Sequence, residues 1–249
     1  MSTGSSYEEL APPAALRDGV SRVWRRTTGA GGEPVRILPD ACVDLIWQRG
    51  EGAFLAGPDT GPNLVTPAPA TTLVGVRFRP GAGGPALGLP LAGFRDQRLP
   101  IAELDPALAD SLPPDLALGD ALRRLVGIAA RMVRSRPPDR AVAEAARALA
   151  SPATRVAALA RDLGLSERQL RRRSEAAVGY GPKTLQRVLR LQRVVERLAA
   201  PDPPADVDLA GLAFEAGYAD QSHLTRECGA LTGLTPAALA AARRPSTAP

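Results

Sequence analysis

The pattern of hydrophobic and polar positions changes about two fifths of the way along the chain. Before that point, short apolar or alternating runs are separated by Gly and Pro, which is typical of strands. In the last of these runs Val74, Val76 and Phe78 occupy alternate positions, as in a strand buried on one face. The predicted strands are residues 35–38, 42–47, 53–56 and 73–78. We therefore expect a β-rich N-terminal half, a small barrel or sandwich.

From about Ile101 the apolar residues recur at helical spacing. Helix starts are marked by Ser, Asp or Pro, and helix ends by Gly or Pro. The predicted helices are residues 116–133, 140–150, 156–162, a helix capped by Ser166 with Gln169 at the capping-box position, a long helix at about 182–199, and shorter helices after Asp208, Asp220 and Pro236. The fold class is thus α+β, with one domain at 1–138, which also holds the first helices, and an all-α domain at 139–249.

The helical half contains an internal repeat. Seven residues recur in order with intervals of 4, 2, 4, 2, 7 and 3 in the first copy and 4, 3, 4, 2, 7 and 3 in the second. The two sets are Ala160, Gly164, Ser166, Leu170, Arg172, Gly179 and Pro182, and Ala213, Gly217, Asp220, Leu224, Arg226, Gly233 and Pro236. In each copy Gly ends a short helix and Ser or Asp caps the next one. This is the pattern of a helix-turn-helix, whose second helix enters the DNA major groove.

The two predicted units span about 155–181 and 208–236, and a linker helix at about 182–199 joins them. At 1.5 Å per residue a linker of about 18 residues is roughly 27 Å long. It can therefore hold two reading helices about one DNA turn, roughly 34 Å, apart on the same face of a duplex. The repeat and its linker together predict a protein that reads two successive major grooves.

The second helix of the first unit is rich in arginine. Leu170 and Ser174 share its inward face, which leaves Arg168, Arg171 and Arg172 pointing outward. Arginine makes bidentate contacts with guanine and also binds phosphate. We assign Arg168 and Arg171 to bases and Arg172 to a base or the backbone; an arginine-rich helix that is merely solvated is the alternative.

The second reading helix offers a different set of side chains. Gln221 can pair with adenine, Ser222 and Arg226 can hold phosphate, and a neutral His223 can do either. Nothing near His223 completes a metal or catalytic site. The predicted DNA-binding residues are Ser166, Arg168, Gln169, Arg171, Arg172, Lys183, Gln221, Ser222, His223 and Arg226.

Net charge sharpens the contrast between the two units. The 249 residues carry a formal charge of +5 with a pI near 10.0, and Lys183 is the only lysine. Residues 155–197 hold 11 basic and 4 acidic residues, a net charge of +7, whereas residues 198–242 hold 1 basic and 6 acidic residues, a net charge of −5. We therefore expect the first unit to bind DNA more strongly than the second.

These features resemble the DNA-binding domain of AraC/XylS-type bacterial transcription regulators over residues 155–239. The resemblance rests on residues 159–172, on 216–226 and on Gly233-Leu234-Thr235-Pro236. It implies that the outward positions of both second helices touch DNA. The family usually has Phe at the positions of Ser174 and Cys228, so both cores lose a large aromatic, and basic residues common in the family are missing from 230–232.

The first half resembles an uncharacterised N-terminal domain attached to some members of that family, through residues 38–47, 56–60 and 75–81. Family members often carry a cupin-like barrel here that binds a small effector or dimerises. Trp47 and Arg77, on predicted strands, are candidates to line a pocket for an anionic or aromatic effector; a core position for Trp47 and a salt bridge for Arg77 are the favoured alternatives. For Asp40 and Asp44 we expect a turn cap and an exposed strand residue rather than a carboxylate pair.

The main hypothesis is a cytoplasmic, nucleoid-associated regulator with no enzymatic activity, no catalytic residue, no metal and no cofactor. Its expected partners are double-stranded DNA, a small-molecule effector, a second copy of the chain and, for an activator, RNA polymerase, but no membrane. One alternative is a protein–protein interaction module without a DNA role. Another is a DNA alkyl-acceptor protein using Cys42, although two scattered cysteines cannot build the zinc thiolate site of such proteins.

Overall fold

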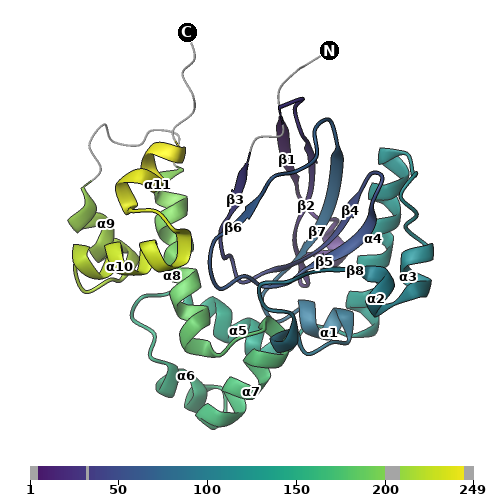
Figure 1. Cartoon of the computed structure of the whole chain (residues 1–249). Helices are drawn as coiled ribbons and strands as arrows, with labels where there is room; N and C mark the ends of the chain where they lie inside the picture. Colours follow the sequence, from purple (N-terminus) through teal and green to yellow (C-terminus); the bar gives the residue numbers. More distant parts are fainter. Residues whose placement is uncertain (1–4, 32–33, 200–207, 244–249) are drawn as a thin grey trace.

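The computed structural model describes residues 5–31, 34–199 and 208–243 (Figure 1). The N-terminal half is built on a six-stranded antiparallel sheet, and a two-stranded sheet faces it (Figure 1). The large sheet has the order β1 (Ser6–Leu10), β2 (Val20–Thr27), β7 (Thr72–Phe78), β4 (Val43–Gln48), β5 (Gly52–Ala56) and β8 (Arg98–Pro100). The small sheet pairs β3 (Val35–Ile37) with β6 (Asn63–Val65).

Side-chain alternation gives the large sheet two different faces. On β4, Val43, Leu45 and Trp47 join the main hydrophobic core, which also contains Val74, Val76 and Phe78 of β7. Helix α4 (Leu118–Ser135) covers this face with Leu125 and Ile128, among others. The smaller elements of this half are η1 (Ala14–Leu16), α1 (Gly83–Leu87), η2 (Leu91–Phe94), α2 (Ile101–Leu104) and α3 (Pro106–Asp110). The predicted β-rich domain is therefore confirmed.

Four strands were not predicted, because their sequences do not show the period of a half-buried strand. Strands β6 and β8 have three residues each, and β1 pairs only with β2 at the edge of the sheet. Strand β2 carries three arginines, two of which form ion pairs with the facing strand, Arg22 with Glu9 and Arg25 with Glu8. Charged cross-strand pairs stabilise a sheet without producing an alternating apolar pattern.

The C-terminal half is entirely helical where it is described. Its helices are α5 (Arg140–Leu149), α6 (Val156–Asp162), α7 (Glu167–Val178), α8 (Pro182–Leu198), α9 (Leu209–Ala216), α10 (Gln221–Thr232) and α11 (Pro236–Arg243). The predicted capping box is present: the Gln169 N–H donates to Ser166 Oγ at 3.2 Å, and the Ser166 N–H donates to Gln169 Oε1 at 2.8 Å. Asp208 and Asp220 cap α9 and α10 as predicted.

Helix α8 joins two separate cores. Its first half contributes Leu185 and Val188 to the core of the first helix-turn-helix unit, and its second half contributes Val194 and Leu198, among others, to the core of the second unit. The two units therefore pack at opposite ends of one rod (Figure 1). This confirms the predicted all-α architecture of two units on a long helix.

Small side chains replace the two expected aromatics. Ser174 is buried and donates through Oγ to the Tyr180 carbonyl at 2.7 Å, and Cys228 is fully buried with its Sγ 3.6 Å from Thr232 Oγ1. Each core holds one buried tyrosine, Tyr180 in the first unit and Tyr218 in the second. The aromatic volume of each core thus comes from another position in its sequence.

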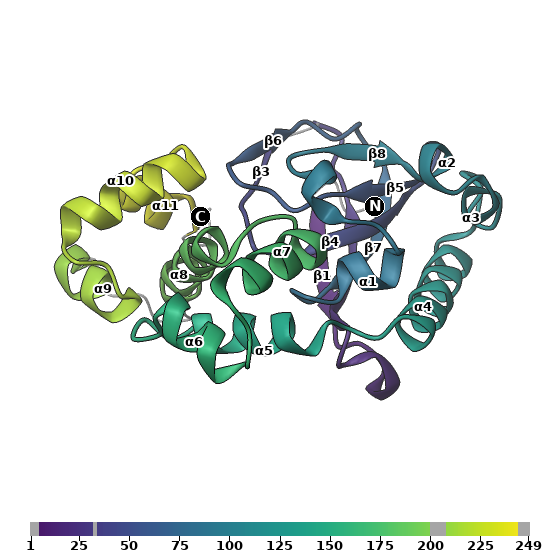
Figure 2. The same cartoon turned by 90° about the horizontal axis from the view of Figure 1, so that it is seen from below.

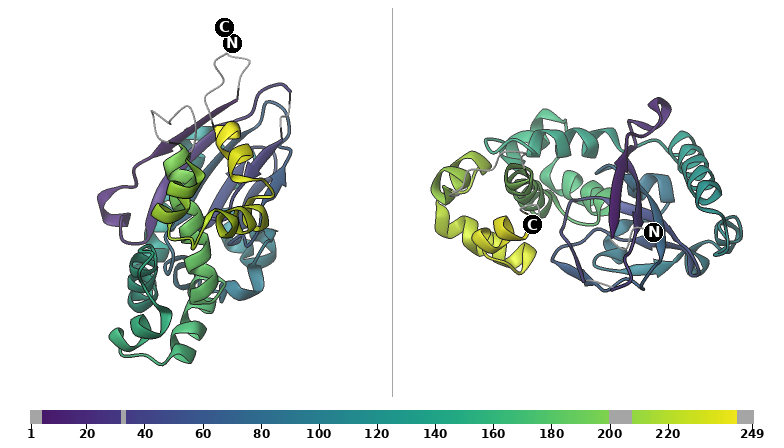
Figure 3. Two further views of the ribbon diagram at one scale, coloured as in Figure 1. Left: turned by 90° about the vertical axis from the view of Figure 1, so that its left-hand side faces the viewer. Right: turned by 90° about the horizontal axis from the view of Figure 1, so that it is seen from above.

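The two halves are packed against each other (Figures 2 and 3). Helix α7 lies on α1, where a Cβ on Gly84 would collide with the Ala176 carbonyl oxygen, so this close approach requires glycine. The connector between β3 and β4 reaches both helical units: Leu38 packs on the second core, and Ala41 belongs to the first. None of the described helices is both long and apolar enough to cross a membrane.

Candidate nucleic-acid interface and effector pocket

The N-terminal half of α7 presents the predicted arginines to solvent. Arg168, Gln169, Arg171 and Arg172 are all exposed, and among the described residues neither Arg168 nor Arg172 has an ion-pair partner. Arg171 Nε donates to Glu175 Oε1 at 2.8 Å. Because exposed ion pairs stabilise little, the Arg171 guanidinium can exchange this carboxylate for another acceptor.

Arg173, the last arginine of this run, has a different role. It binds Asp139 through two hydrogen bonds of 2.9 and 2.7 Å, and the same carboxylate caps α5 by accepting from the Val142 N–H. Burial raises the pKa of Asp139, but the hydrogen bonds from Arg173 and the backbone outweigh it and lower the pKa overall. Arg173 therefore anchors α7 to the start of α5.

Helix α10 exposes Gln221, Ser222 and Arg226, as predicted. His223, by contrast, is half-buried and held within the unit. Its Nδ1 accepts from the Ala219 N–H at 3.3 Å, and its ring lies edge-on to Tyr218 with 5.2 Å between centroids. The ring is therefore engaged inside the second unit rather than presented with the other three side chains.

The opposite charges of the linker and the second unit partly neutralise each other. Arg187 Nε donates to Glu227 Oε1 at 2.8 Å, and Arg197 Nε lies 3.2 Å from Glu215 Oε2. Much of the positive charge of α8 is thus directed at the acidic residues of α9 and α10. Lys183, at the start of α8, remains exposed. On α7, by contrast, Arg168 and Arg172 have no ion-pair partner among the described residues.

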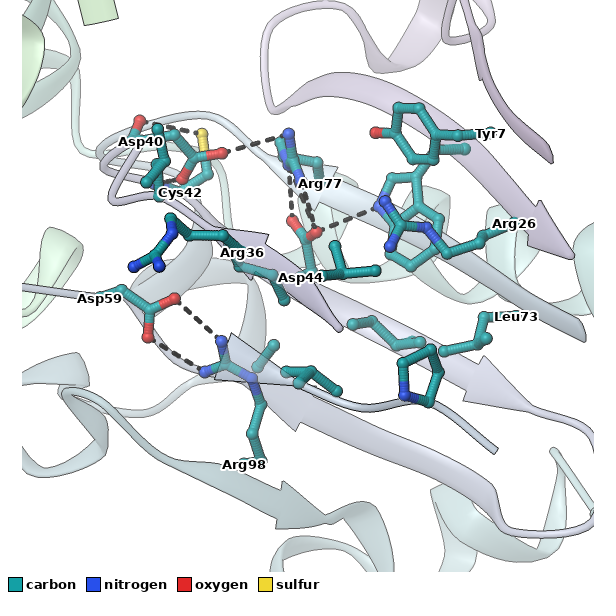
Figure 4. Close-up of a pocket in the computed structure, with 18 of the residues that line it drawn as sticks. Tyr7, Arg26, Arg36, Asp40, Cys42, Asp44, Asp59, Leu73, Arg77 and Arg98 are labelled. Carbon is teal, nitrogen blue, oxygen red and sulfur yellow. Dashed lines mark hydrogen bonds and ion pairs between the residues drawn. The ribbon is translucent and has the colours of Figure 1, made fainter. Parts of the chain in front are cut away.

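A pocket of about 600 Å³ lies between the two sheets of the N-terminal half (Figure 4). Its apolar wall comes from the face of the large sheet opposite the main core and includes Trp24, Ile46, Phe54 and Leu73. Gln192 and Val195 of α8 also line it, so both halves of the chain contribute to one cavity. A volume of this size holds a small organic molecule.

Residues 38–47, 56–60 and 75–81, on which the resemblance of the N-terminal half rests, all contribute to the polar end of the pocket. Arg77 binds Asp44 at 3.0 Å and Asp40 at 3.1 Å, and Asp59 binds Arg98 at 2.8 Å (Figure 4). Asp44 also accepts from Trp24 Nε1 at 3.1 Å and is buried. The expectation of an exposed strand residue was therefore wrong for Asp44, whereas Asp40 caps its turn as expected, since its Oδ1 accepts from the Cys42 N–H at 2.9 Å. The Asp40 and Asp44 carboxylates share the Arg77 guanidinium. The β4–β7 register pairs Asp44 with Arg77, and Asp40 contacts the same side chain from the connector that precedes β4.

The electrostatics of this cluster follow from its burial. Burial lowers the pKa of Arg77, but Asp44 and Asp40 outweigh it and hold the pKa above its ordinary value. Burial also raises the pKa of Asp40 and, together with Asp40, that of the Cys42 thiol. Cys42 therefore stays protonated at neutral pH, which makes it a poor nucleophile and argues against the alkyl-acceptor alternative.

Of the two candidate effector residues, only Arg77 lines the pocket. Trp47 is fully buried on the other face of β4, and its Nε1 donates to the Pro113 carbonyl at 2.9 Å. Trp47 as an effector residue is therefore wrong, because successive side chains of a strand point to opposite faces and Asp44, Ile46 and Gln48 take the pocket side.

Besides Arg98, which is paired with Asp59, two further arginines line the pocket that were not identified from the sequence, Arg26 and Arg36. Arg26 lies over the Tyr7 ring with its Cζ 5.0 Å from the centroid, and Arg36 Nη1 donates to the Thr232 carbonyl at the end of α10, at 2.8 Å. Neither forms an ion pair with any residue that the structure describes. Arg26 was missed because β2 was not predicted, and Arg36 because its partner lies 196 residues away.

The raised pKa of Asp40 predicts a pH dependence of stability. Below the ordinary aspartate pKa of about 4, Asp40 is protonated in both the folded and the unfolded chain, and its contribution to stability is fully present. As the pH rises, the unfolded chain releases this proton first. The contribution is therefore lost as the pH passes through the raised pKa of Asp40 in the folded chain. Asp40→Asn should therefore make the decline of unfolding free energy above about pH 4 shallower. Urea unfolding at several pH values measures it, and the exposed Asp18→Asn should keep the wild-type profile. Parallel profiles for wild type and Asp40→Asn would contradict the expectation.

Comparisons with known proteins find one matching family model in each half of the chain. Residues 8–100 match the model of a domain of unknown function, and residues 159–242 match the model of a helix-turn-helix domain. No curated protein matches the chain. Among solved structures, ToxT from Vibrio cholerae O395 is 9% identical with a TM-score of 0.45, over 98% of this chain and 99% of ToxT. A second crystal structure of ToxT from Vibrio cholerae is 10% identical with a TM-score of 0.44, over 94% of this chain and 98% of ToxT.

Likenesses to solved structures this distant carry no information on ligands or partners. The assignment of the C-terminal domain rests instead on the matched helix-turn-helix model and on the two capped units that the structure places at the ends of α8. Residues 159–242 are therefore a helix-turn-helix domain of AraC type, a domain of DNA-binding transcription regulators, and residues 8–100 are a domain of unknown function.

Proposed function

We propose that the chain recognises a specific DNA sequence by placing α7 and α10 in two successive major grooves. The observation that carries this proposal is the pair of exposed guanidiniums, Arg168 and Arg172, which have no ion-pair partner among the described residues. They project from a capped helix, and a second capped helix lies at the other end of α8. The 17 residues of α8 span roughly 25 Å, which suits neighbouring grooves.

The contacts follow from exposure. In the first unit Arg168 and Arg171 read bases, and Arg172 binds a base or phosphate. In the second, Gln221 reads a base while Ser222 and Arg226 hold the backbone, and His223 supports the helix from inside the unit. Ser166, Gln169 and Lys183 complete the surface at the edges of the first reading helix.

Binding of the purified full-length chain to genomic DNA fragments, followed by dimethyl sulfate footprinting of guanine N7 in the major groove, tests this function. We expect two protected major grooves about one helical turn apart, and an affinity that falls steeply with salt, because guanidiniums displace counterions from phosphate. A chain that binds no DNA at low salt would instead support the protein–protein interaction module.

We also infer that the N-terminal domain, which we end at residue 138, binds a small effector in the pocket. In chain order, Val133 is the last residue of the main core of this domain. All residues of the next core except Ala41 lie at or after Val142, and this supports a boundary between the two. The effector we expect is an anion with an apolar or aromatic body. Arg26 and Arg36 offer guanidiniums that lack carboxylate partners in the described part of the chain, and Trp24 and Phe54 offer aromatic surface.

Control of DNA binding by this effector would pass through contacts that already join the two domains. Gln192 lines the pocket from α8 and donates to the Pro39 carbonyl. Arg36 lines it from β3 and binds the end of α10. A ligand that touches both domains binds best to one arrangement of them, and so shifts the population towards it.

Isothermal titration with 4-phenylbutyrate and its neutral amide tests the pocket. The acid should bind at least tenfold more tightly than the amide, and Arg36→Gln should lose that difference. Arg49→Gln makes the same substitution at an exposed arginine outside the pocket, and it should retain the difference in affinity between acid and amide. Equal affinity for acid and amide in the wild type, or binding of neither, would contradict the anionic effector.

A further inference from the structure

Helix α10 carries one acidic side chain that points inward. Leu224, Cys228 and Leu231 form its buried seam, and Glu227 lies beside that seam, facing α8. Only 13% of the Glu227 side chain is exposed. A carboxylate buried to this extent requires charged partners, because removing it from water is costly.

The partners of Glu227 come from two elements. Arg187 of α8 donates to its Oε1 at 2.8 Å, and Arg190, one turn further along α8, places Nη1 3.6 Å from its Oε2. His223 of α10 itself brings Nε2 to 3.7 Å from Oε1. Residues three apart share one face of a helix, so both arginines meet the carboxylate from the same side of α8.

The same cluster fixes the turn before α10. The Arg190 guanidinium lies over the Tyr218 ring, 5.1 Å from its centroid, and its side chain is only 14% exposed. Arg193 donates to the Ala216 carbonyl at 2.7 Å, at the end of α9. Glu227 is thus the acidic centre of a set of side chains that joins the linker helix, the turn and the second reading helix.

We propose that Glu227 is a positioning residue for DNA reading, which sets the rotation of α10 about its axis relative to α8. Gln221, Ser222 and Arg226 lie on the same rigid helix, so that rotation decides where they enter the second groove. The apolar seam alone does not determine it, because Leu and Cys contacts are nondirectional, whereas ion pairs to two fixed arginines are directional. This proposal rests on the two-groove function above.

Glu227→Gln tests the proposal, with Glu215→Gln as its matched control. Each variant removes one negative charge from the second unit, so both change the general attraction to phosphate equally. The Glu215–Arg197 pair, however, is 58% and 66% exposed and joins α9, not α10, to the linker. The two variants therefore separate positioning of α10 from net charge.

The measurement uses an operator selected for binding to the wild type and two variants of it, each with one half-site scrambled. Discrimination at a half-site is the affinity for the intact operator divided by the affinity for the operator with that half-site scrambled. In folded Glu227→Gln, discrimination at the second half-site should fall at least tenfold while discrimination at the first half-site stays unchanged. Glu215→Gln should keep both within twofold. Arg187→Gln, compared with Arg197→Gln, repeats the test from the linker side in case Glu227→Gln does not fold.

Equal discrimination in Glu227→Gln and Glu215→Gln would overturn the proposal while leaving two-groove binding intact. If the wild type protects fewer than two grooves, the proposed function fails instead. Whether Glu227 positions α10 is then tested in the free protein. Electron–electron distance measurements between spin labels at Arg161→Cys and Thr225→Cys, in a Cys42→Ser background, should then show a shifted or broadened distance in Glu227→Gln only. An unchanged distribution would overturn it.

Discussion

Arg168→Ala is expected to weaken binding to the selected operator by about 1–3 kcal/mol and to relax the preference for one base pair. The guanidinium is exposed near the start of α7 and has no ion-pair partner among the described residues, so it is free to form a bidentate contact with guanine. Fluorescence anisotropy on the operator and on a panel of single-base variants measures both effects. Arg147→Ala, on the exposed side of α5, removes the same charge and should keep the base preference.

A uniform loss of affinity across the panel would reassign Arg168 to a phosphate contact. Arg171 provides a useful comparison, because its Nε is engaged by Glu175 in the free protein. If Arg171 reads a base, Glu175→Gln should not weaken operator binding, since it frees the guanidinium. If the ion pair instead orients Arg171 for that base, Glu175→Gln should weaken binding.

Trp47→Ala is expected to lower the free energy of unfolding by about 3–5 kcal/mol. The indole is fully buried in the main core of the N-terminal domain, and its N–H is satisfied by the Pro113 carbonyl. Truncation leaves a large cavity and an unpaired carbonyl. Urea unfolding followed by circular dichroism measures the loss, and Trp47→Phe should lose less because most of the volume remains.

A loss below about 1 kcal/mol for Trp47→Ala would mean that the core collapses around the missing indole. Binding of 4-phenylbutyrate gives an independent control, because Trp24 and not Trp47 lines the pocket. In folded Trp47→Phe, ligand affinity should equal that of the wild type. A large loss of ligand affinity in this variant would place Trp47 back among the effector residues.

The helical half could be predicted closely because its signals are local. Ser166, Asp208 and Asp220 cap helices within three residues of themselves, and the Gly residues that end helices act at their own positions. The exposed face of α7 follows from the helical period alone. His223 is the exception, since its edge-on contact with Tyr218 depends on how the turn before α10 closes.

The N-terminal half was less predictable because its strands and pocket depend on distant partners. Strand β2 is stabilised by pairing with β1 and β7, and its arginines conceal the alternation that predicts a strand. Asp44 and Arg77 are 33 residues apart and meet only through the β4–β7 register. The choice between Trp47 and its neighbours as pocket residues required knowing which face of β4 meets the core.

Two capped helices on a common linker helix could be predicted from the sequence alone, because capping, helical period and an internal repeat are properties of neighbouring residues. The same sequence shows a net charge of +7 on residues 155–197 and of −5 on residues 198–242. The folded structure was needed to show that Arg187 and Arg190 of α8 meet at Glu227 of the acidic second unit, and that residues of both halves line one pocket. The reason is physical: an ion pair or a cavity is defined by positions in space, and chain order leaves those positions open until the core has packed.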